Sequence, residues 1–129
     1  MAERHILLVE DDPTVREMIT RALKRDYTVH EATDGMHASE LITQIPVLPA
    51  LIICDVMMPR VDGFSLIRLL KKDDRLKPVP VLFLTAKSAP QDVVEGIAIG
   101  AAHYMTKPFK VSELRERVDK LVTGRDSRA

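Results

Sequence analysis

Short apolar runs alternate along the chain with longer segments in which apolar residues recur at helical spacing. Five segments, at 5–9, 28–32, 50–55, 79–84 and 101–105, have the length of a β-strand. The run at 28–32 alternates between apolar and polar residues, so we expect this strand to be less buried than the first. The run at 50–55 is apolar until it ends on Asp55, which predicts a buried strand with a carboxylate at its end.

The segments between the runs predict helices. Apolar periodicity indicates helices at 13–25, 36–45 and 63–72, a short one at 93–100, and a final one that Ser112 caps. Asp12 is the expected N-cap of the first helix, with Pro13 in its first turn. From Gly124 onward the chain is polar, and we expect it to fray. Five strands alternating with five helices predict an α/β fold, in which helices cover both faces of a parallel sheet.

Composition narrows the class of protein. The length of 129 residues fits one domain, and 46% hydrophobic with 29% charged residues argues against a largely disordered chain. Nineteen basic residues balance nineteen acidic ones, which is unlike the basic surface of a nucleic-acid-binding domain. No apolar run has the length of a membrane span, and the short apolar start predicts no signal peptide. A single cysteine, Cys54, suits a reducing compartment, so we expect a cytoplasmic protein with this thiol in its core.

Polar side chains that could take part in binding or catalysis follow most of the predicted strands. Glu10 and Asp11 follow the first strand, Asp55 ends the third, Thr85 ends the fourth, and Lys107 lies just beyond the fifth. Each alone has an ordinary structural explanation, such as a helix cap or a solvated lysine. Parallel strands end at one edge of the sheet, however, and open α/β sheets bind ligands at that edge.

The convergence of these residues predicts phosphoryl chemistry. Clustered carboxylates repel one another unless a cation lies between them, and Mg²⁺ is the hard cation that such oxygen ligands favour. An aspartate beside Mg²⁺ can attack phosphorus and become an acyl phosphate, which makes Asp55 a candidate phosphoryl acceptor. Lys107 would neutralise part of the phosphoryl charge, and the Thr85 hydroxyl can donate to a phosphoryl oxygen.

Four segments in order, from residue 4 to about residue 122, resemble the receiver domain of two-component response regulators. They are the acidic segment 6–12, the segment 52–59 with Gly63, the segment 84–86 around Thr85, and the segment 104–109. The resemblance implies a flavodoxin-like, doubly wound (βα)5 sheet with strand order 2-1-3-4-5. It gives a receiver domain at 1–124, followed by a frayed tail or the start of a linker at 125–129.

The resemblance also assigns the metal site. It implies that Asp11, Asp55 and the backbone carbonyl of Met57 bind Mg²⁺ directly, while Glu10 acts mainly through water. Asp12, the third acid of the run, is assigned to helix capping rather than to metal binding.

The resemblance implies a phosphorylation switch rather than an enzyme with a released product. A histidine kinase or phosphotransfer protein would transfer a phosphoryl group to Asp55, and Lys107 would pair with that group or with Asp55. Thr85 would then move inward and Tyr104 would fill the vacated space, remodelling the face of the fourth helix, last strand and final helix. The bond between Lys107 and Pro108 is expected to be cis.

The sequence departs from the family pattern at two places. Ala102-His103-Tyr104 stands where many DNA-binding relatives carry Asp-Asp-Tyr, so their salt-bridged dimer is not expected, although a phosphorylation-dependent homodimer stays open. Met57 offers no group to orient an attacking water, which predicts slow self-hydrolysis of the phosphorylated form. The sequence does not identify the downstream effector or the cognate histidine kinase.

Three alternatives remain open. A haloacid-dehalogenase-type phosphatase also uses a strand-end aspartate with Mg²⁺, but it would need a second acid where Met57 stands. A flavin-binding flavodoxin-like protein would need a phosphate-cradling loop in place of the acids at 10–12. The third alternative is a receiver-like interaction scaffold that is not phosphorylated.

Overall fold

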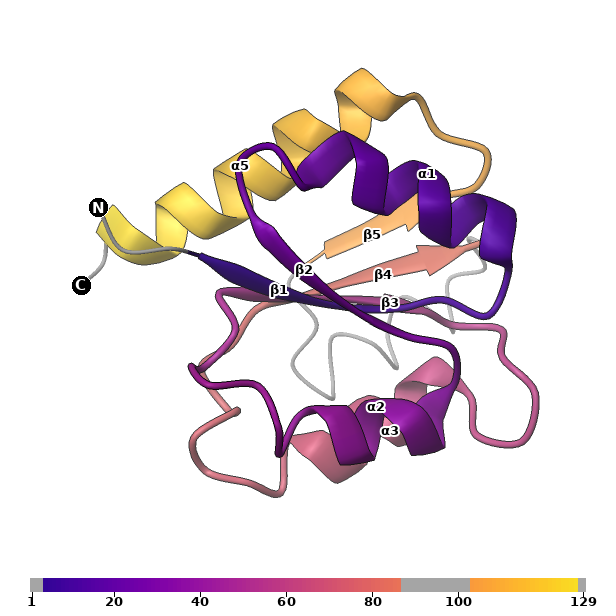
Figure 1. Ribbon diagram of the computed structural model, residues 1–129, viewed down its shortest axis with the longest axis vertical. Coiled ribbons are helices and arrows are strands. Elements are labelled where there is room, and N and C mark those ends of the chain that lie inside the picture. Colours follow the sequence, from indigo (N-terminus) through magenta and orange to yellow (C-terminus); the bar gives the residue numbers. More distant parts are fainter. Residues whose placement is uncertain (1–3, 87–102, 128–129) are drawn as a thin grey trace.

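A parallel β-sheet lies between two layers of helices (Figure 1). The computed structural model describes residues 4–86 and 103–127. Within them, the strands are β1 (His5–Val9), β2 (Thr28–Ala32), β3 (Leu51–Asp55), β4 (Val81–Thr85) and β5 (His103–Thr106). They form a five-stranded sheet in the order β2-β1-β3-β4-β5, and every neighbouring pair is parallel. The predicted α/β class and strand order are confirmed.

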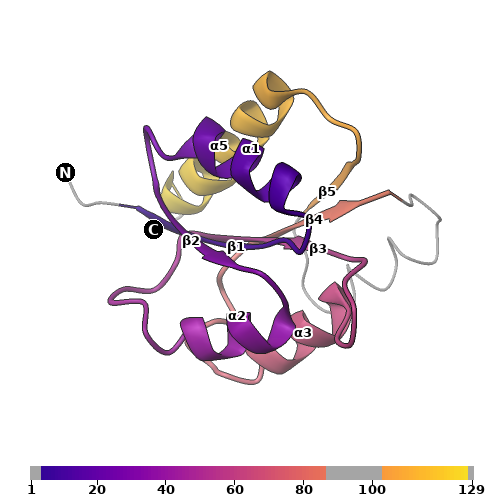
Figure 2. The same ribbon diagram turned by 45° about the vertical axis from the view of Figure 1, so that its right-hand side comes forward.

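Two helices cover each face of this sheet in the described chain. Helices α1 (Pro13–Leu23) and α5 (Val111–Ser127) lie on one face, and α2 (Gly35–Leu41) and α3 (Gly63–Leu70) lie on the other (Figures 1 and 2). The sandwich explains the apolar runs, because the central strands β1, β3 and β4 are buried along their whole length. The edge strands β2 and β5 keep several partly or fully exposed residues.

Successive side chains along each strand point to opposite faces of the sheet, and they pack into two separate cores. On β3, Ile52 and Cys54 belong to the core beneath α2 and α3, whereas Leu51 and Ile53 belong to the core beneath α1 and α5. Asp55 follows this run at the carboxyl end of β3, so the burial of the strand delivers a carboxylate to the edge of the sheet.

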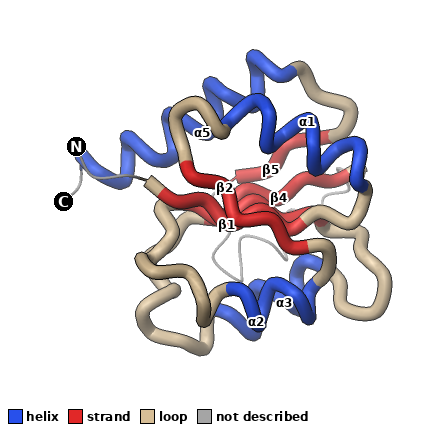
Figure 3. Tube along the Cα trace, in the orientation of Figure 1, coloured by secondary structure: helices blue, strands red, loops and turns tan. Residues whose placement is uncertain are grey.

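Helices α1, α2 and α3 follow strands β1, β2 and β3 along the chain (Figure 3), and an aspartate caps the start of each of these helices. The Asp12 carboxylate accepts hydrogen bonds from the backbone N–H groups of Thr14 and Val15, which confirms the predicted cap of α1. Asp34 caps α2 and Asp62 caps α3 in the same way. Asp62 was not identified from the sequence, although an aspartate directly before a helix is a typical cap signal.

Helix α5 differs from its prediction at both ends. It begins at Val111, so Ser112 lies inside the helix and is not its cap; instead, the Glu113 carboxylate accepts a hydrogen bond of 3.2 Å from the backbone N–H of Lys110. The helix also continues through Gly124 to Ser127, where the sequence predicted a frayed tail. Once a helix is nucleated, each further residue adds a hydrogen bond, so polar composition alone does not end it. The domain boundary at residue 124 stays a prediction.

Other predicted boundaries shift by a few residues. Helix α2 ends at Leu41, and turns replace the predicted helix over most of 42–45. The predicted helix at 93–100 lies outside the described residues. In the part of the chain that the structure describes, no helix combines the length and apolar character needed to span a bilayer.

Gly63 fixes the approach of α3 to the end of β3. Its backbone N–H donates a hydrogen bond of 2.9 Å to the carbonyl of Val56. A Cβ atom at this position would lie 2.3 Å from the backbone oxygen of Asp55, closer than any real carbon contact. The first residue of α3 therefore has to be a glycine for the helix to lie against the acidic strand end.

Gly63→Ala is expected to lower the free energy of unfolding by about 1–3 kcal/mol, because the added methyl group must displace the backbone of β3 or α3. Chemical denaturation of the two proteins measures the difference. Gly124→Ala is the matched control: a Cβ there meets no atom within 4 Å. Since Gly124 lies in a helix, this control should gain about 0.5–1 kcal/mol. Equal stability of Gly63→Ala and wild type would contradict the close-packing argument.

Candidate functional site

The carboxyl ends of the strands bring together the acids that the sequence singled out. Glu10 and Asp11 directly follow β1, and Asp55 is the last residue of β3. One carboxylate oxygen from each of the three lies within 4.8 Å of the others. The three differ in exposure: Glu10 is fully buried, Asp55 is 3% exposed, and Asp11 is exposed.

Lys107 reaches into this group from the segment after β5. Its Nζ atom lies 2.8 Å from Oε1 of Glu10 and 3.2 Å from Oδ2 of Asp55. Its backbone N–H donates to the carbonyl of Thr85 at 2.8 Å, which ties the segment to the end of β4. The peptide bond between Lys107 and Pro108 is cis, as the resemblance implied.

Backbone donors orient the two buried carboxylates. Oδ1 of Asp55 accepts a hydrogen bond of 3.1 Å from the backbone N–H of Met57. Oε2 of Glu10 accepts one of 3.1 Å from the backbone N–H of Asp12. Each carboxylate therefore uses one oxygen for the backbone and the other for Lys107.

Burial of these acids perturbs their ionisation. Desolvation raises the pKa of Glu10 to about 7, although its hydrogen bond with Lys107 opposes the shift. Desolvation also raises the pKa of Asp55, and the charge of Lys107 opposes that shift. For Lys107, burial alone would lower the pKa, but the hydrogen bond with Glu10 and the charges of both acids give a net raised pKa.

The donor set of the site fits a hard divalent cation. Three carboxylates face one ammonium group, so the cluster carries excess negative charge when its acids are ionised. Its candidate ligand atoms are all oxygens, and one of the acids, Asp11, is open to solvent. Mg²⁺ prefers oxygen ligands from a small number of carboxylates and keeps several waters, which an open side of the site allows.

Thr85 and Tyr104 lie beside this cluster on neighbouring strands. Thr85 is buried at the end of β4, two residues after Phe83, so both side chains belong to the same face of the strand. Tyr104 is the β5 partner of Phe83 in the sheet register, and the two rings lie 5.6 Å apart. The ring of Tyr104 is therefore partly buried one pleat away from Thr85.

One feature of the site differs in emphasis from the sequence interpretation. The sequence paired Lys107 with Asp55 or a phosphoryl group, whereas the shorter contact in the structure is with Glu10. Cys54 is buried as predicted, and desolvation followed by the charge of Asp55 raises the pKa of its thiol, so it is a core residue.

The raised pKa of Glu10 makes stability depend on pH. Between about pH 4.5 and pH 7 the unfolded chain ionises Glu10 while the folded chain keeps its proton, so stability is lost as pH rises through this window. Without Mg²⁺, the unfolding free energy of Glu10→Gln relative to wild type should therefore rise by about 3 kcal/mol from pH 4.5 to pH 7.

Denaturation at a series of pH values measures this difference. Glu40→Gln, at an exposed position on α2, is the control variant. Parallel pH profiles for wild type and Glu10→Gln would contradict the assignment.

Comparison with known proteins agrees with this geometry. The family model described as the response regulator receiver domain matches residues 6–119. The chain is 39% identical over 122 residues to the DNA-binding dual master transcriptional regulator RpaA of Synechocystis, covering 94% of this chain and 50% of that protein. It is 40% identical over 120 residues to histidine kinase P4 of Formosa agariphila, covering 93% of this chain and 9% of that protein.

Solved structures give the same result. The chemotaxis protein CheY4 of Vibrio cholerae superposes with a TM-score of 0.88 at 30% identity, covering 93% of this chain and 99% of that one. The chain spans half or less of the length of the two relatives above, so their printed functions belong to those proteins. The match over residues 6–119 and the shared fold show that the chain belongs to the response regulator receiver domain family.

Proposed function

We propose that the chain is a phosphorylation-dependent switch in which Asp55 is the phosphoryl acceptor. Family membership supports two-component signalling in general. The observation that carries the specific assignment is the environment of Asp55: a carboxylate 3% exposed, 3.2 Å from the Lys107 ammonium and grouped with two further acids. Such an arrangement is costly for stability alone, because removing carboxylates from water is unfavourable.

The transfer step uses a histidine kinase or phosphotransfer protein as donor. An oxygen of the Asp55 carboxylate attacks the phosphorus of a phosphohistidine and forms the new P–O bond. The P–N bond breaks, and the imidazole leaves with the bonding electron pair and takes up a proton. The Lys107 ammonium stands where it can stabilise charge on the transferred group, since its Nζ already lies near the acceptor oxygen.

Asp11, Asp55 and the backbone carbonyl of Met57 would hold Mg²⁺, with Glu10 acting mainly through water. The bound ion would supply charge neutralisation for the phosphoryl oxygens. The support from the structure is the set of carboxylate oxygens within 4.8 Å. Asp12 takes no part in this proposal, because its carboxylate is engaged as the cap of α1.

The output of the switch is a change of surface. A phosphoryl group on Asp55 attracts the Thr85 hydroxyl, and Tyr104 follows into the space that Thr85 leaves. The shared strand face and the 5.6 Å ring contact of Tyr104 with Phe83 support this coupling, because the tyrosine ring packs against the strand face on which Thr85 lies. The face that includes β5 and α5 would then present a different surface to an effector or output domain.

The chain acts on itself and on partners rather than on a small-molecule substrate. Its only catalysis would be its own phosphorylation and dephosphorylation, in the cytoplasm. Membership of the receiver family leaves the dehalogenase-type and flavin-binding alternatives without support. The remaining alternative is an interaction scaffold that is not phosphorylated. An experiment distinguishes it from the proposed switch.

Incubation with acetyl phosphate and Mg²⁺ should add one phosphate to the wild-type chain, seen by intact mass. Asp55→Asn should acquire none, because an amide is a far weaker nucleophile than a carboxylate, and chelation of Mg²⁺ should suppress the wild-type adduct. No adduct on wild type would favour the scaffold, and the same adduct on both proteins would place the acceptor elsewhere.

Met57 should give the phosphorylated form a lifetime well beyond seconds. Its side chain is 53% exposed and, as a thioether, gives an attacking water little orientation. Met57→Gln supplies an amide that can hold this water, so it should shorten the lifetime several-fold in a decay time course. Met36→Gln, at an exposed position on α2, is the control and should leave the decay unchanged. Decay of the wild type within seconds would contradict the role given to Met57.

A further inference from the structure

Arg16 reaches from α1 back to the acidic end of β1, although the function proposed above gives it no role. It closes the first turn of α1, and long side chains on a helix point toward the start of that helix. Its Nη1 atom donates a hydrogen bond of 2.9 Å to the backbone carbonyl of Glu10. The same atom lies 3.5 Å from the backbone carbonyl of Asp11. One guanidinium group therefore contacts the backbone of two of the three clustered acids.

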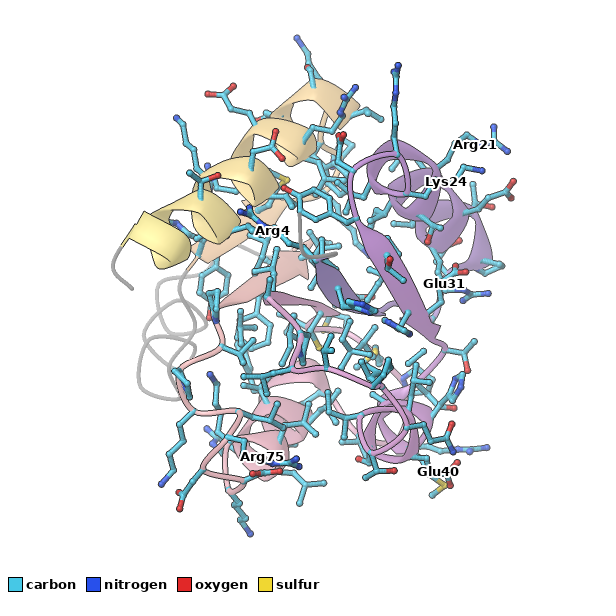
Figure 4. All side chains as sticks on the ribbon, turned by 60° about the vertical axis from the view of Figure 1, so that its left-hand side comes forward. Arg4, Arg21, Lys24, Glu31, Glu40 and Arg75 are labelled. Atoms are coloured by element: carbon cyan, nitrogen blue, oxygen red, sulfur yellow. The ribbon has the colours of Figure 1, made fainter. Side chains whose placement is uncertain are left out.

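An ion pair with the edge strand β2 orients this guanidinium group. Nε of Arg16 lies 3.7 Å from Oε1 of Glu31, which Figure 4 labels on β2. Glu31 follows Val29 by two residues, and Val29 packs against the core beneath α1 and α5, so both side chains belong to the face that α1 covers. The next residue of β2, Ala32, accepts a hydrogen bond of 3.1 Å from the backbone N–H of Glu10. The acidic segment is thus tied to β2 through its N–H group and, by way of Arg16, through its carbonyl group.

The surroundings of Arg16 differ from those of the other arginine on α1. The Arg16 side chain is 19% exposed, whereas that of Arg21 is 72% exposed and pairs with Glu17 on the same helix. Figure 4 shows Arg21 extending from α1 away from the sheet. Taking a cation partly out of water is unfavourable unless hydrogen bonds compensate, and bonds from a charged donor are stronger than neutral ones. The contact of Arg16 with the acidic segment therefore restrains that segment, while the surface pair of Arg21 does not.

Arg16 would affect a cation bound at the acids in two opposite ways. Its positive charge would repel Mg²⁺ and lower the affinity, although salt screens this repulsion. Its hydrogen bonds would hold the backbone that carries Glu10 and Asp11, which would raise the affinity because Mg²⁺ demands a near-ideal arrangement of its ligands. Groups that orient metal ligands typically change metal affinity by about 10–100-fold, so the orienting effect should be the larger.

We propose that Arg16 is a positioning residue of the acidic site, which raises its affinity for Mg²⁺ by holding the backbone of Glu10 and Asp11. Arg16 contacts their carbonyl groups, so it is neither a metal ligand nor the counter-charge of the carboxylates. The inference rests on the Mg²⁺ site proposed above, but it does not require phosphoryl transfer to Asp55.

Titration of the metal-free chain with Mg²⁺ in a calorimeter tests this role. Arg16→Met keeps the length of the side chain but removes its donors and its charge, and should weaken Mg²⁺ binding by about tenfold. Arg16→Lys keeps the charge without the rigid fork of nitrogens, so it should recover only part of the loss. Arg21→Met removes the same charge from the same helix and is the control, which should bind Mg²⁺ at least as tightly as wild type. Circular dichroism confirms that each variant is folded.

Phosphorylation by acetyl phosphate separates the binding of Mg²⁺ from the chemical step. Arg16→Met should need about tenfold more Mg²⁺ for half-maximal adduct formation, yet reach the wild-type rate once Mg²⁺ is saturating. A general loss of structure would lower the rate at saturating Mg²⁺ as well, which would contradict a positioning role. A chain that binds Mg²⁺ in the expected order of variants but acquires no phosphate would overturn the proposed switch and still support the role of Arg16.

The sign of the change in affinity decides the proposal. Tighter Mg²⁺ binding by Arg16→Met would mean that Arg16 acts only through its charge, and would overturn the positioning role. Equal binding by Arg16→Met and wild type would overturn it too. A wild-type chain that binds no Mg²⁺ would contradict the proposed metal site itself, and with it the role of Arg16.

Discussion

The site depends on keeping carboxylates away from water beside a single ammonium group. Glu10 is fully buried and Asp55 is nearly so, and both carboxylates contact the ammonium group of Lys107. The pKa of Glu10, raised to about 7, shows that one counter-charge does not fully compensate the burial. In the proposed switch this unmet charge would make the site responsive, because a bound cation or a phosphoryl group would change the forces on every residue that contacts it.

The rest of the fold holds this unfavourable cluster in place. Three central strands buried on both faces fix the ends of β1, β3 and β4 relative to one another through their ladder register. Gly63 then allows α3 to begin against the backbone of Asp55, and the backbone N–H of Lys107 is bonded to Thr85. The acids therefore cannot relax apart without disturbing the packing of the sheet, which is densely filled.

The sequence predicted most of the fold and the members of the site, for a clear physical reason. Buried parallel strands are continuous apolar runs, so their ends, and hence Glu10, Asp55 and Thr85, can be read directly. The pairing of Lys107 with Glu10 could not be read, because it depends on the register between strands far apart in the chain. The extension of α5 beyond Gly124 was missed for a related reason: polar composition does not report where hydrogen bonding along a helix stops.

Exposure was the least predictable property. Met36 and Leu69 have the apolar character of core positions, and the sequence assigned them to helices without indicating which side chains would face solvent. The structure leaves both exposed because α2 and α3 turn other residues, such as Ala38 and Leu66, toward the sheet. An apolar side chain on a helix can lie either in the core or at an exposed interface. Only the packing of the helix in the folded protein distinguishes the two positions.

The segment between β3 and α3 links the acidic site to an apolar groove between α2 and α3. It begins beside Asp55, whose carboxylate accepts from Met57, and it ends at Val61, which lines the groove and contacts α2 near Gly35. If phosphorylation of Asp55 shifts this segment, the shift must alter the shape of the groove. Linkage is reciprocal, so anything bound in the groove would then change the phosphorylation equilibrium by the same factor. If residues 57–61 are rigid, the acidic site and the groove are instead independent of each other. Whether the two are coupled therefore depends on how far residues 57–61 move.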